Sequence, residues 1–392
     1  MKVLVIGGTG IIGTGIVEAA VGCGHEVLAV SRQLKPIHNK ALNVKYLQRN
    51  WYDDFAAREL LENITVDVIV DGLVYTPDNL VRDLKLARGH CKQFIYISTA
   101  GVYEQPTIMA EENASKRVEN LYWSYSKNKR EAEIYLEQHG KEYPFMITTI
   151  RPTFTYGDTR IPCAMVGKQN PWTLLARILE GKPIVFIEDG KKLHAITHIS
   201  IFANAVVGLF LNPNADMEFF HVCDDKAYTW EDVINAVGEL LGVVPKIVHI
   251  PIEALKPLNE ALYVEIKYNK MQEVTFSNRK IKSVVSDVCY HVELKDGLES
   301  TIEHLQTEYA VKKRDIMFDR LCDMLLLRYD KYNLTKEEYA VAKKYIEQMP
   351  KEEKHFFKKE IRRHRVKYYI MKHVIHIVKL KKINIRKNMM QL

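Results

Sequence analysis

The strongest structural signal in the chain is an apolar run at its N-terminus that ends in three evenly spaced glycines. The run predicts a buried strand, and the apolar face of the segment after the glycines predicts a helix. A strand, a glycine-rich turn and a helix N-terminus together hold the pyrophosphate of a dinucleotide, because free N–H groups and the helix dipole favour negative charge there. We therefore expect a dinucleotide to contact the residues of this loop, namely Gly7, Thr9, Gly10, Ile11, Ile12 and Gly13.

Strand-like and helix-like segments alternate along the next part of the chain. The strand segments are continuously apolar, which is typical of a parallel sheet buried on both faces. We predict an α/β fold of the Rossmann type, with a doubly wound parallel sheet, a smaller substrate lobe and a helical C-terminal extension. The predicted strands lie at 25–30, 44–47, 66–70, 93–98 and 146–150, and the predicted helices at 54–63, 78–90 and 125–139.

These patterns suggest three parts. Residues 1–158 form the dinucleotide-binding domain, to which residues 196–244 return. Residues 159–195 and 245–310 form the substrate lobe, and residues 311–392 form a basic helical extension. Within the extension, an apolar stripe after residue 315 predicts one helix, and Thr335 followed by Glu337 and Glu338 predicts the start of another.

The extension is much more basic than the rest of the chain. Residues 311–392 carry 23 Lys and Arg against 10 Asp and Glu, and no acidic residue follows Glu360. Lysine and arginine alternate there with branched aliphatic residues and tyrosines, which is typical of a helix on an anionic membrane surface. Binding to RNA phosphates and docking of a partner protein are the alternatives.

Cysteine spacing and hydropathy exclude several other classes. The six cysteines contain no C-x-x-C pair, so we expect neither a metal site nor a disulfide framework. We expect no signal peptide and no membrane-spanning segment. The expected location is cytoplasmic, and peripheral at the inner membrane face if the tail binds lipid.

The end of the second strand bears on the choice of cofactor. NAD-binding proteins usually place an acidic residue there to bind the ribose hydroxyls, whereas this chain has Ser31 and Arg32. Because an arginine can pair with a 2′-phosphate, the residues favour NADP and leave NAD as the alternative. Asn50 and Trp51, which follow the third strand, are also expected at the cofactor.

A tyrosine and a lysine on one predicted helix are the candidates for acid–base chemistry. Tyr125 and Lys129 share a face one turn apart. A lysine ammonium near a phenol lowers the pKa of the tyrosine toward the range useful for proton transfer. Thr99 follows the fifth strand, where its hydroxyl is expected to hold a substrate oxygen. Thr99, Tyr125 and Lys129 are therefore the predicted catalytic residues, and Lys129 is also expected at the cofactor.

Together these motifs resemble the short-chain dehydrogenase/reductase superfamily, in its extended branch of sugar-nucleotide epimerases and dehydratases. The resemblance spans residues 1–305 and implies that Thr99, Tyr125 and Lys129 take the catalytic Ser/Thr, Tyr and Lys roles. It also implies that Arg151 and Pro152 flank the nicotinamide, and that a homodimer forms through the helices at 78–90 and 125–139. The motifs are the glycine loop, 97–103, Tyr125-x-x-x-Lys129 with Glu133, 151–157, His198-Ile199, 219–222 and 229–232.

Two departures from the family pattern leave alternatives open. An alignment that uses Lys127 in place of Lys129 would put Trp123 at the tyrosine position, and we prefer Tyr125 with Lys129. The segment 71–77 replaces the small-residue turn that relatives have after the fourth strand.

The expected function is NAD(P)-dependent hydride transfer on a sugar or nucleotide-sugar, by epimerisation, dehydration or reduction. The rival is an atypical member without catalysis that binds RNA, as the chloroplast stem-loop-binding proteins do, or that acts as a cofactor-binding scaffold through its basic tail.

Overall fold

The structure is a computed structural model that describes residues 1–33, 43–116, 123–167, 170–308, 314–328, 334–355, 358–359 and 362. Contacts divide the described residues into two compact units. The first lies within 1–163, 191–242 and 268–312, and the second lies within 164–190, 243–267 and the part beyond 312. The C-terminal helices thus share a unit with part of the expected substrate lobe, whereas residues 268–308 share a unit with the sheet.

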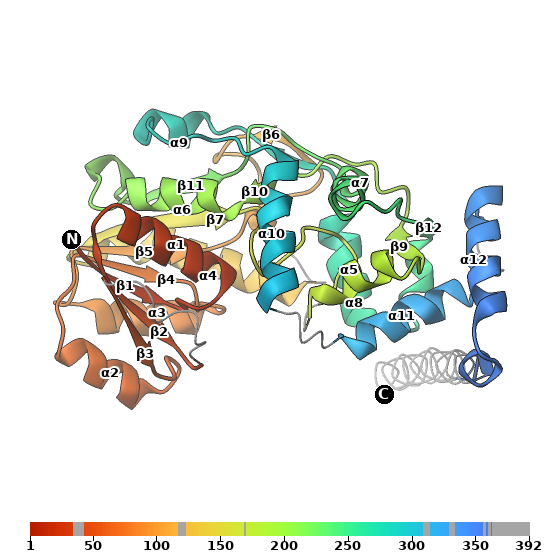
Figure 1. Ribbon diagram of the computed structural model, residues 1–392. Coiled ribbons are helices and arrows are strands. Elements are labelled where there is room, and N and C mark those ends of the chain that lie inside the picture. The colour runs from red at the N-terminus through yellow and green to blue at the C-terminus, as the bar shows by residue number, and fades with distance from the viewer. Residues whose placement is uncertain are drawn as a thin grey trace, which may run out of the picture. The chain divides into compact units, whose positions relative to one another are not determined.

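Within the described residues, a seven-stranded parallel sheet forms the centre of the first unit (Figure 1). Its strand order is β3-β2-β1-β4-β5-β7-β11, so the order reverses between β1 and β4. A doubly wound sheet leaves a ligand crevice at this reversal, outside the carboxyl ends of the strands. The predicted Rossmann-type fold is confirmed. The strands are β1 Lys2–Ile6, β2 Glu26–Ser31, β3 Val44–Gln48, β4 Val68–Asp71, β5 Gln93–Ile97, β7 Met146–Pro152 and β11 Glu218–Val222.

Helices cover both faces of this sheet, which explains why its strands are continuously apolar. One face packs against α1 Ile11–Gly22 and α6 Ile199–Gly208, around Val5, Ile16 and Phe202. The opposite face packs against three helices around Leu4, Leu84 and Leu136. These helices are α2 Asp54–Glu62, α3 Pro77–Ala87 and α4 Ser124–His139.

Capping side chains determine where several helices begin. Thr76 and Asn79 form a reciprocal capping box at α3, and Pro77 occupies its first turn. Asp53 accepts from the first-turn N–H groups of α2. By contrast, the residue before α1 is Gly10, which has no side chain to cap the helix. The first-turn N–H groups of α1 therefore receive no capping side chain from Gly10.

The remaining elements of the first unit extend the sheet domain. Two short parallel pairs join segments distant in sequence, and α10 contacts α7. They are β6 Thr107–Ala110 with β13 Val274–Phe276, β8 Phe154–Tyr156 with β10 Ile196–His198, α7 Trp230–Leu241, α9 Arg279–Val284 and α10 Leu294–Glu308.

In the second unit, a buried arginine links the segment around residue 177 to the helix that carries Asp319 and Asp323. Arg177 is 1% exposed and forms ion pairs with Asp319 and Asp323, and Asp323 also accepts a hydrogen bond from the Tyr345 hydroxyl at 2.9 Å. Thr335 caps its last helix with a capping box, as predicted. The elements are α5 Trp172–Leu179, β9 Ile184–Ile187, β12 Ile247–Ile250, α8 Glu260–Glu265, α11 Ile316–Leu326 and α12 Lys336–Gln348.

The basic tail after Glu360, for which membrane, RNA and protein partners were predicted, lies almost wholly outside the described residues. None of the helices that the structure describes is long and apolar enough to cross a membrane.

Candidate active site

The glycine-rich loop forms a tight turn between β1 and α1. Gly7 has a φ of +85°, a conformation that residues with a side chain rarely adopt, and its N–H donates to the Val30 carbonyl at 2.9 Å. A Cβ at Gly13 would overlap the Gly7 carbonyl oxygen, so only glycine lets α1 pack this close to the turn. A Cβ at Gly10 would meet only that oxygen, at 3.6 Å, and would otherwise extend into open space.

A cavity of about 270 Å³ opens at this loop, at the reversal of strand order between β1 and β4. It runs from the glycine loop past the segments that follow β4 and β5 to the first turns of α4. Its lining includes the predicted residues Gly7, Gly10, Ile11, Ile12, Gly13, Tyr125, Lys129 and Pro152, together with Gly72, Leu73, Tyr75, Ser98 and Arg160.

Tyr125 lines one end of the cavity, and Thr99 contacts Tyr125 without lining the cavity itself. Thr99 caps the short 3₁₀ turn after β5, and its side chain hydrogen-bonds to the Tyr125 phenol. Burial nevertheless raises the pKa of Tyr125 to about 12, and the Thr99 hydrogen bond only partly opposes this increase. The lowered phenol pKa expected from the Tyr125–Lys129 spacing is therefore not present in the structure.

Lys129 lies one turn along α4, with its side chain buried. Its Nζ donates to the Ile97 carbonyl at 2.6 Å, and lies 5.0, 5.5 and 5.9 Å from the ring centroids of Tyr96, Tyr75 and Tyr125. Burial lowers the pKa of Lys129 to about 7, and the carboxylates of Asp71 and Glu133 partly offset that effect. A lysine with this pKa changes its charge within the physiological range.

The alternative alignment uses a lysine that lies on the surface. The Lys127 side chain is 48% exposed and pairs with Glu131 at 3.7 Å. Trp123 precedes the first turn of α4, and one of its ring atoms lies 3.1 Å from where a Cβ on Gly101 would stand. The structure thus places Lys129 on the cavity and Lys127 away from it.

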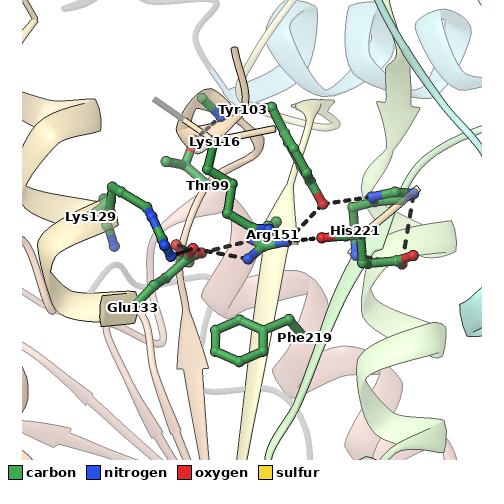
Figure 2. A network of polar contacts seen from close by, with 12 residues as sticks. Thr99, Tyr103, Lys116, Lys129, Glu133, Arg151, Phe219 and His221 are labelled. Carbon is green, nitrogen blue, oxygen red and sulfur yellow. Dashed lines mark hydrogen bonds and ion pairs between the residues drawn. The ribbon is translucent and has the colours of Figure 1, made fainter. Parts of the chain in front are cut away.

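Behind the site, a buried network joins α4, β5, β7 and β11 (Figure 2). Arg151 donates from Nε and Nη2 to the two oxygens of Glu133, at 2.8 and 2.9 Å. Glu133 also accepts from the Ser98 hydroxyl at 2.7 Å, and Arg151 donates to the Tyr103 hydroxyl at 2.7 Å. Tyr103 in turn contacts His221 Nδ1 at 3.0 Å. The network therefore fixes the segment after β5 that carries Thr99.

Several residues expected at the cofactor do not line the cavity. Arg151 is 0% exposed in the network described above, so only its neighbour Pro152 lines the cavity. Trp51 is buried in the core beneath α2 and α3. Both were expected to contact the cofactor, and neither side chain lines the cavity. The Thr9 and Ser31 hydroxyls hydrogen-bond to each other at 2.6 Å. Asn50 and Arg32 are exposed.

Sequence reasoning missed four residues of this region. Tyr75 and Arg160 line the cavity, Asp71 lies buried close to Lys129, and Asp83 lies buried beside Asp71. The departure from the family pattern at 71–77 was the available signal for Asp71 and Tyr75. His221 is buried, and burial lowers its pKa to about 4. Among the described residues, no group of three or more His, Cys, Asp or Glu could hold a metal ion.

Comparison with known proteins defines the class. A model of the NAD dependent epimerase/dehydratase family matches residues 3–72 and 74–222, which is more than half of the chain. The chain belongs to this family. The predicted resemblance to the extended short-chain dehydrogenases/reductases is confirmed.

Individual relatives are more distant. The chain is 27% identical to chloroplast stem-loop binding protein of 41 kDa b of Arabidopsis thaliana over 266 residues, which cover 63% of this chain and 65% of that protein. The match thus spans just under two thirds of the plant protein. It is 22% identical to UDP-N-acetyl-alpha-D-glucosaminuronate decarboxylase of Bacillus cytotoxicus over 330 residues, covering 77% of this chain and 97% of the decarboxylase.

The fold is also that of a solved epimerase. The structure of UDP-glucuronic acid 4-epimerase from Bacillus cereus, with UDP-glucuronic acid and NAD, superposes with a TM-score of 0.64 and 18% identity. The superposition covers 79% of this chain and 100% of the epimerase. The comparisons do not support the preference for NADP that Ser31 and Arg32 predicted: the family is described as NAD dependent, and the structure of this epimerase holds NAD.

Proposed function

We propose that the protein is an NAD-dependent enzyme that acts on a nucleotide-sugar by reversible hydride transfer, as an epimerase or a dehydratase does. One observation carries the proposal: a single cavity has the glycine loop at one end and Tyr125 with Lys129 at the other. The names of the Bacillus relatives, an epimerase and a decarboxylase of UDP-sugars, support a nucleotide-sugar as the substrate class.

The residues of the cavity fit a dinucleotide. The open space at Gly10 and the uncapped first turn of α1 suit a pyrophosphate, and Pro152 and Lys129 lie where the family places the nicotinamide half. A nicotinamide bound there would supply the group that takes up a hydride from the substrate reversibly. The Ser31 hydroxyl is engaged by Thr9, and no acidic side chain ends β2, so recognition of the ribose differs from the common NAD pattern.

The side chains divide the proton chemistry between them. The Tyr125 phenol exchanges a proton with the substrate hydroxyl at the carbon that is oxidised or reduced. The Thr99 hydroxyl donates a hydrogen bond to the phenol oxygen, and the Lys129 ammonium supplies positive charge close to it. Both interactions favour the phenolate. Since burial raises the pKa of Tyr125 to about 12 even with the Thr99 hydrogen bond in place, a charged Lys129 is needed for Tyr125 to act as a base near neutral pH.

The test is turnover of UDP-sugars by purified protein, measured by product analysis and by the absorbance of bound reduced nicotinamide. We expect Tyr125→Phe to lower turnover by about 100-fold or more while NAD still binds. Tyr135→Phe is the matched control, because Tyr135 lies on the same helix and its hydroxyl contacts Tyr143, which does not line the cavity. Equal turnover of the two variants would contradict the proposed role.

A second pair of variants distinguishes the two lysines. Lys129→Met should lower turnover as strongly as Tyr125→Phe, whereas Lys127→Met removes only a surface ion pair and should leave turnover unchanged. The reverse result would favour the alignment with Trp123 and would leave the site without its tyrosine.

RNA binding is the second candidate function, because one relative is named a stem-loop binding protein. Association with a stem-loop RNA that weakens steeply with salt and is indifferent to Tyr125→Phe would favour it. A homodimer through α3 and α4, and attachment of the basic tail to anionic vesicles, remain predictions that sedimentation and liposome flotation can test.

A further inference from the structure

Two buried carboxyl groups lie behind the wall of the cavity, and the proposed chemistry does not use them. Asp71 is the last residue of β4 and is 0% exposed, and Asp83 lies in α3 and is 2% exposed. In the sheet, Asp71 is flanked by Ile6 of β1 and Tyr96 of β5. Ile6 lines the cavity, and the Tyr96 ring contacts Lys129. Asp71 therefore lies beside one residue of the cavity wall and one neighbour of Lys129.

The two carboxyl groups share a hydrogen bond that requires a proton. Asp71 Oδ1 accepts the Leu73 N–H at 2.8 Å. Arg82 Nη1 forms an ion pair with Asp83 Oδ1 at 3.4 Å, and the Trp51 side chain hydrogen-bonds to Asp83. The two carboxyl groups also hydrogen-bond to each other. One of them must therefore be protonated.

Burial keeps this proton in place at neutral pH. It raises the pKa of Asp83 to about 9, and the adjacent Asp71 carboxylate adds to the increase. Burial raises the pKa of Asp71 as well, while Lys129, Arg82 and the Leu73 N–H stabilise its charged form. We accordingly place the proton on Asp83, which donates to Asp71, and the single negative charge on Asp71.

The negative charge of Asp71 is less engaged by other partners than the charge of Glu133, the other carboxylate near Lys129. Glu133, on the same helix as Lys129, is bound by two N–H groups of Arg151 and also pairs with Arg130. Among the residues that the structure describes, Asp71 has no such bidentate partner, and it is the largest of the charges that raise the pKa of Lys129 against burial. The remaining titratable side chains that face Lys129 are the phenols of Tyr75, Tyr96 and Tyr125.

We propose that Asp71 is a positioning residue that keeps Lys129 protonated, and that the proton on Asp83 holds Asp71 in place as the anion. The inference deepens the proposed function and rests on it, because Lys129 matters there through its charge beside Tyr125. No covalent bond changes: the shared proton stays on Asp83 and the ammonium proton stays on Lys129.

Two isosteric variants separate charge from packing. Asp71→Asn keeps the shape of the side chain and removes the negative charge that faces Lys129. Asp83→Asn replaces the shared proton with an amide N–H that still donates to Asp71, and so preserves the charge. A purely structural role for the pair would make the two variants alike.

The experiment is a direct titration of Lys129 by NMR in protein labelled with ¹³C at lysine Cε, with the signal assigned by its loss in Lys129→Met. We expect Asp71→Asn to lower the pKa of Lys129 by about one unit or more, and Asp83→Asn to leave it unchanged or raise it. The pH profile of kcat/KM should shift in the same direction in each variant.

An unchanged pKa of Lys129 in Asp71→Asn would overturn the proposal, as would a lowered one in Asp83→Asn. Should Asp71→Asn fail to fold, the titration of Asp83→Asn decides on its own. A lowered pKa of Lys129 in Asp83→Asn contradicts the proposal, and an unchanged or raised pKa supports it. The titration needs no turnover, so failure of the proposed enzymatic function would be seen separately.

Discussion

Glu133 with Arg151 and Asp71 with Asp83 are two buried groups that influence the same lysine, and they differ in how their charge is neutralised. Glu133 is neutralised by a guanidinium that donates two hydrogen bonds, and the surrounding hydroxyls of Ser98 and Tyr103 complete the network. The aspartates are neutralised by a proton, which leaves one charge for Lys129.

Because of this difference, we expect the Glu133–Arg151 group to affect mainly the stability of the fold and the Asp71–Asp83 group to affect its dependence on pH. The bidentate pairing of Arg151 with Glu133 fixes the geometry of the residues around it. A carboxyl pair that shares a proton can change its charge, so the aspartate group ties the electrostatics of the site to pH. The comparison therefore predicts that mutations in the first group mainly cost stability, whereas mutations in the second change pH dependence.

The largest expected effect comes from removing Arg151. Arg151→Met leaves Glu133 buried without its bidentate partner, and we expect the free energy of unfolding to fall by about 3–5 kcal/mol. Urea denaturation measures this loss. Arg130→Met is the control, because Arg130 pairs with the same carboxylate at 3.4 Å and with the partly exposed Glu137, and should cost about 1 kcal/mol or less. Similar losses in both variants would remove the distinction between the two groups.

Asp83→Asn should have the next largest effect, and in the opposite direction. In the folded protein Asp83 keeps its proton up to a pKa of about 9, whereas its ordinary pKa is 3.8. Between these values the folded state binds more protons than the unfolded state, so the free energy of unfolding falls as pH rises. Asparagine does not titrate. We therefore expect Asp83→Asn to gain more than about 2 kcal/mol relative to the unaltered protein between about pH 5 and pH 8.

The same urea experiments, repeated across that pH range, measure the difference. A constant offset between Asp83→Asn and the unaltered protein would show that the folded state holds no extra proton at this pair.

The smallest expected effect is that of Ser98→Ala. It removes one hydrogen bond to Glu133 and leaves both Arg151 contacts, so we expect a loss of about 1 kcal/mol in the free energy of unfolding. Because the charge on Glu133 is unchanged, the pKa of Lys129 should stay the same in an NMR titration. A shifted Lys129 titration in Ser98→Ala would show that the Glu133 group, too, controls the lysine.

Local patterns predicted much of the fold and part of the site. The spacing of Gly7, Gly10 and Gly13 predicted the turn before α1, and the helix that carries Tyr125 and Lys129 begins within one residue of its predicted start. These predictions succeeded because turns, caps and helix faces depend on residues close together in the chain. The structure differs from the prediction at Arg151, whose side chain does not line the cavity, and at Tyr125, whose pKa burial raises, because burial depends on residues distant in the chain.

The sequence by itself determined the alternation of strands and helices, the dinucleotide loop and the pairing of Tyr125 with Lys129 one helical turn apart. Only the tertiary structure decided which charges surround that lysine. Asp71 and Asp83 meet because β4 and α3 pack together, and Tyr103 reaches His221, 118 residues away, because β5, β7 and β11 are neighbours in the sheet. Burial and distance set the charge of each group, and the order of strands sets both.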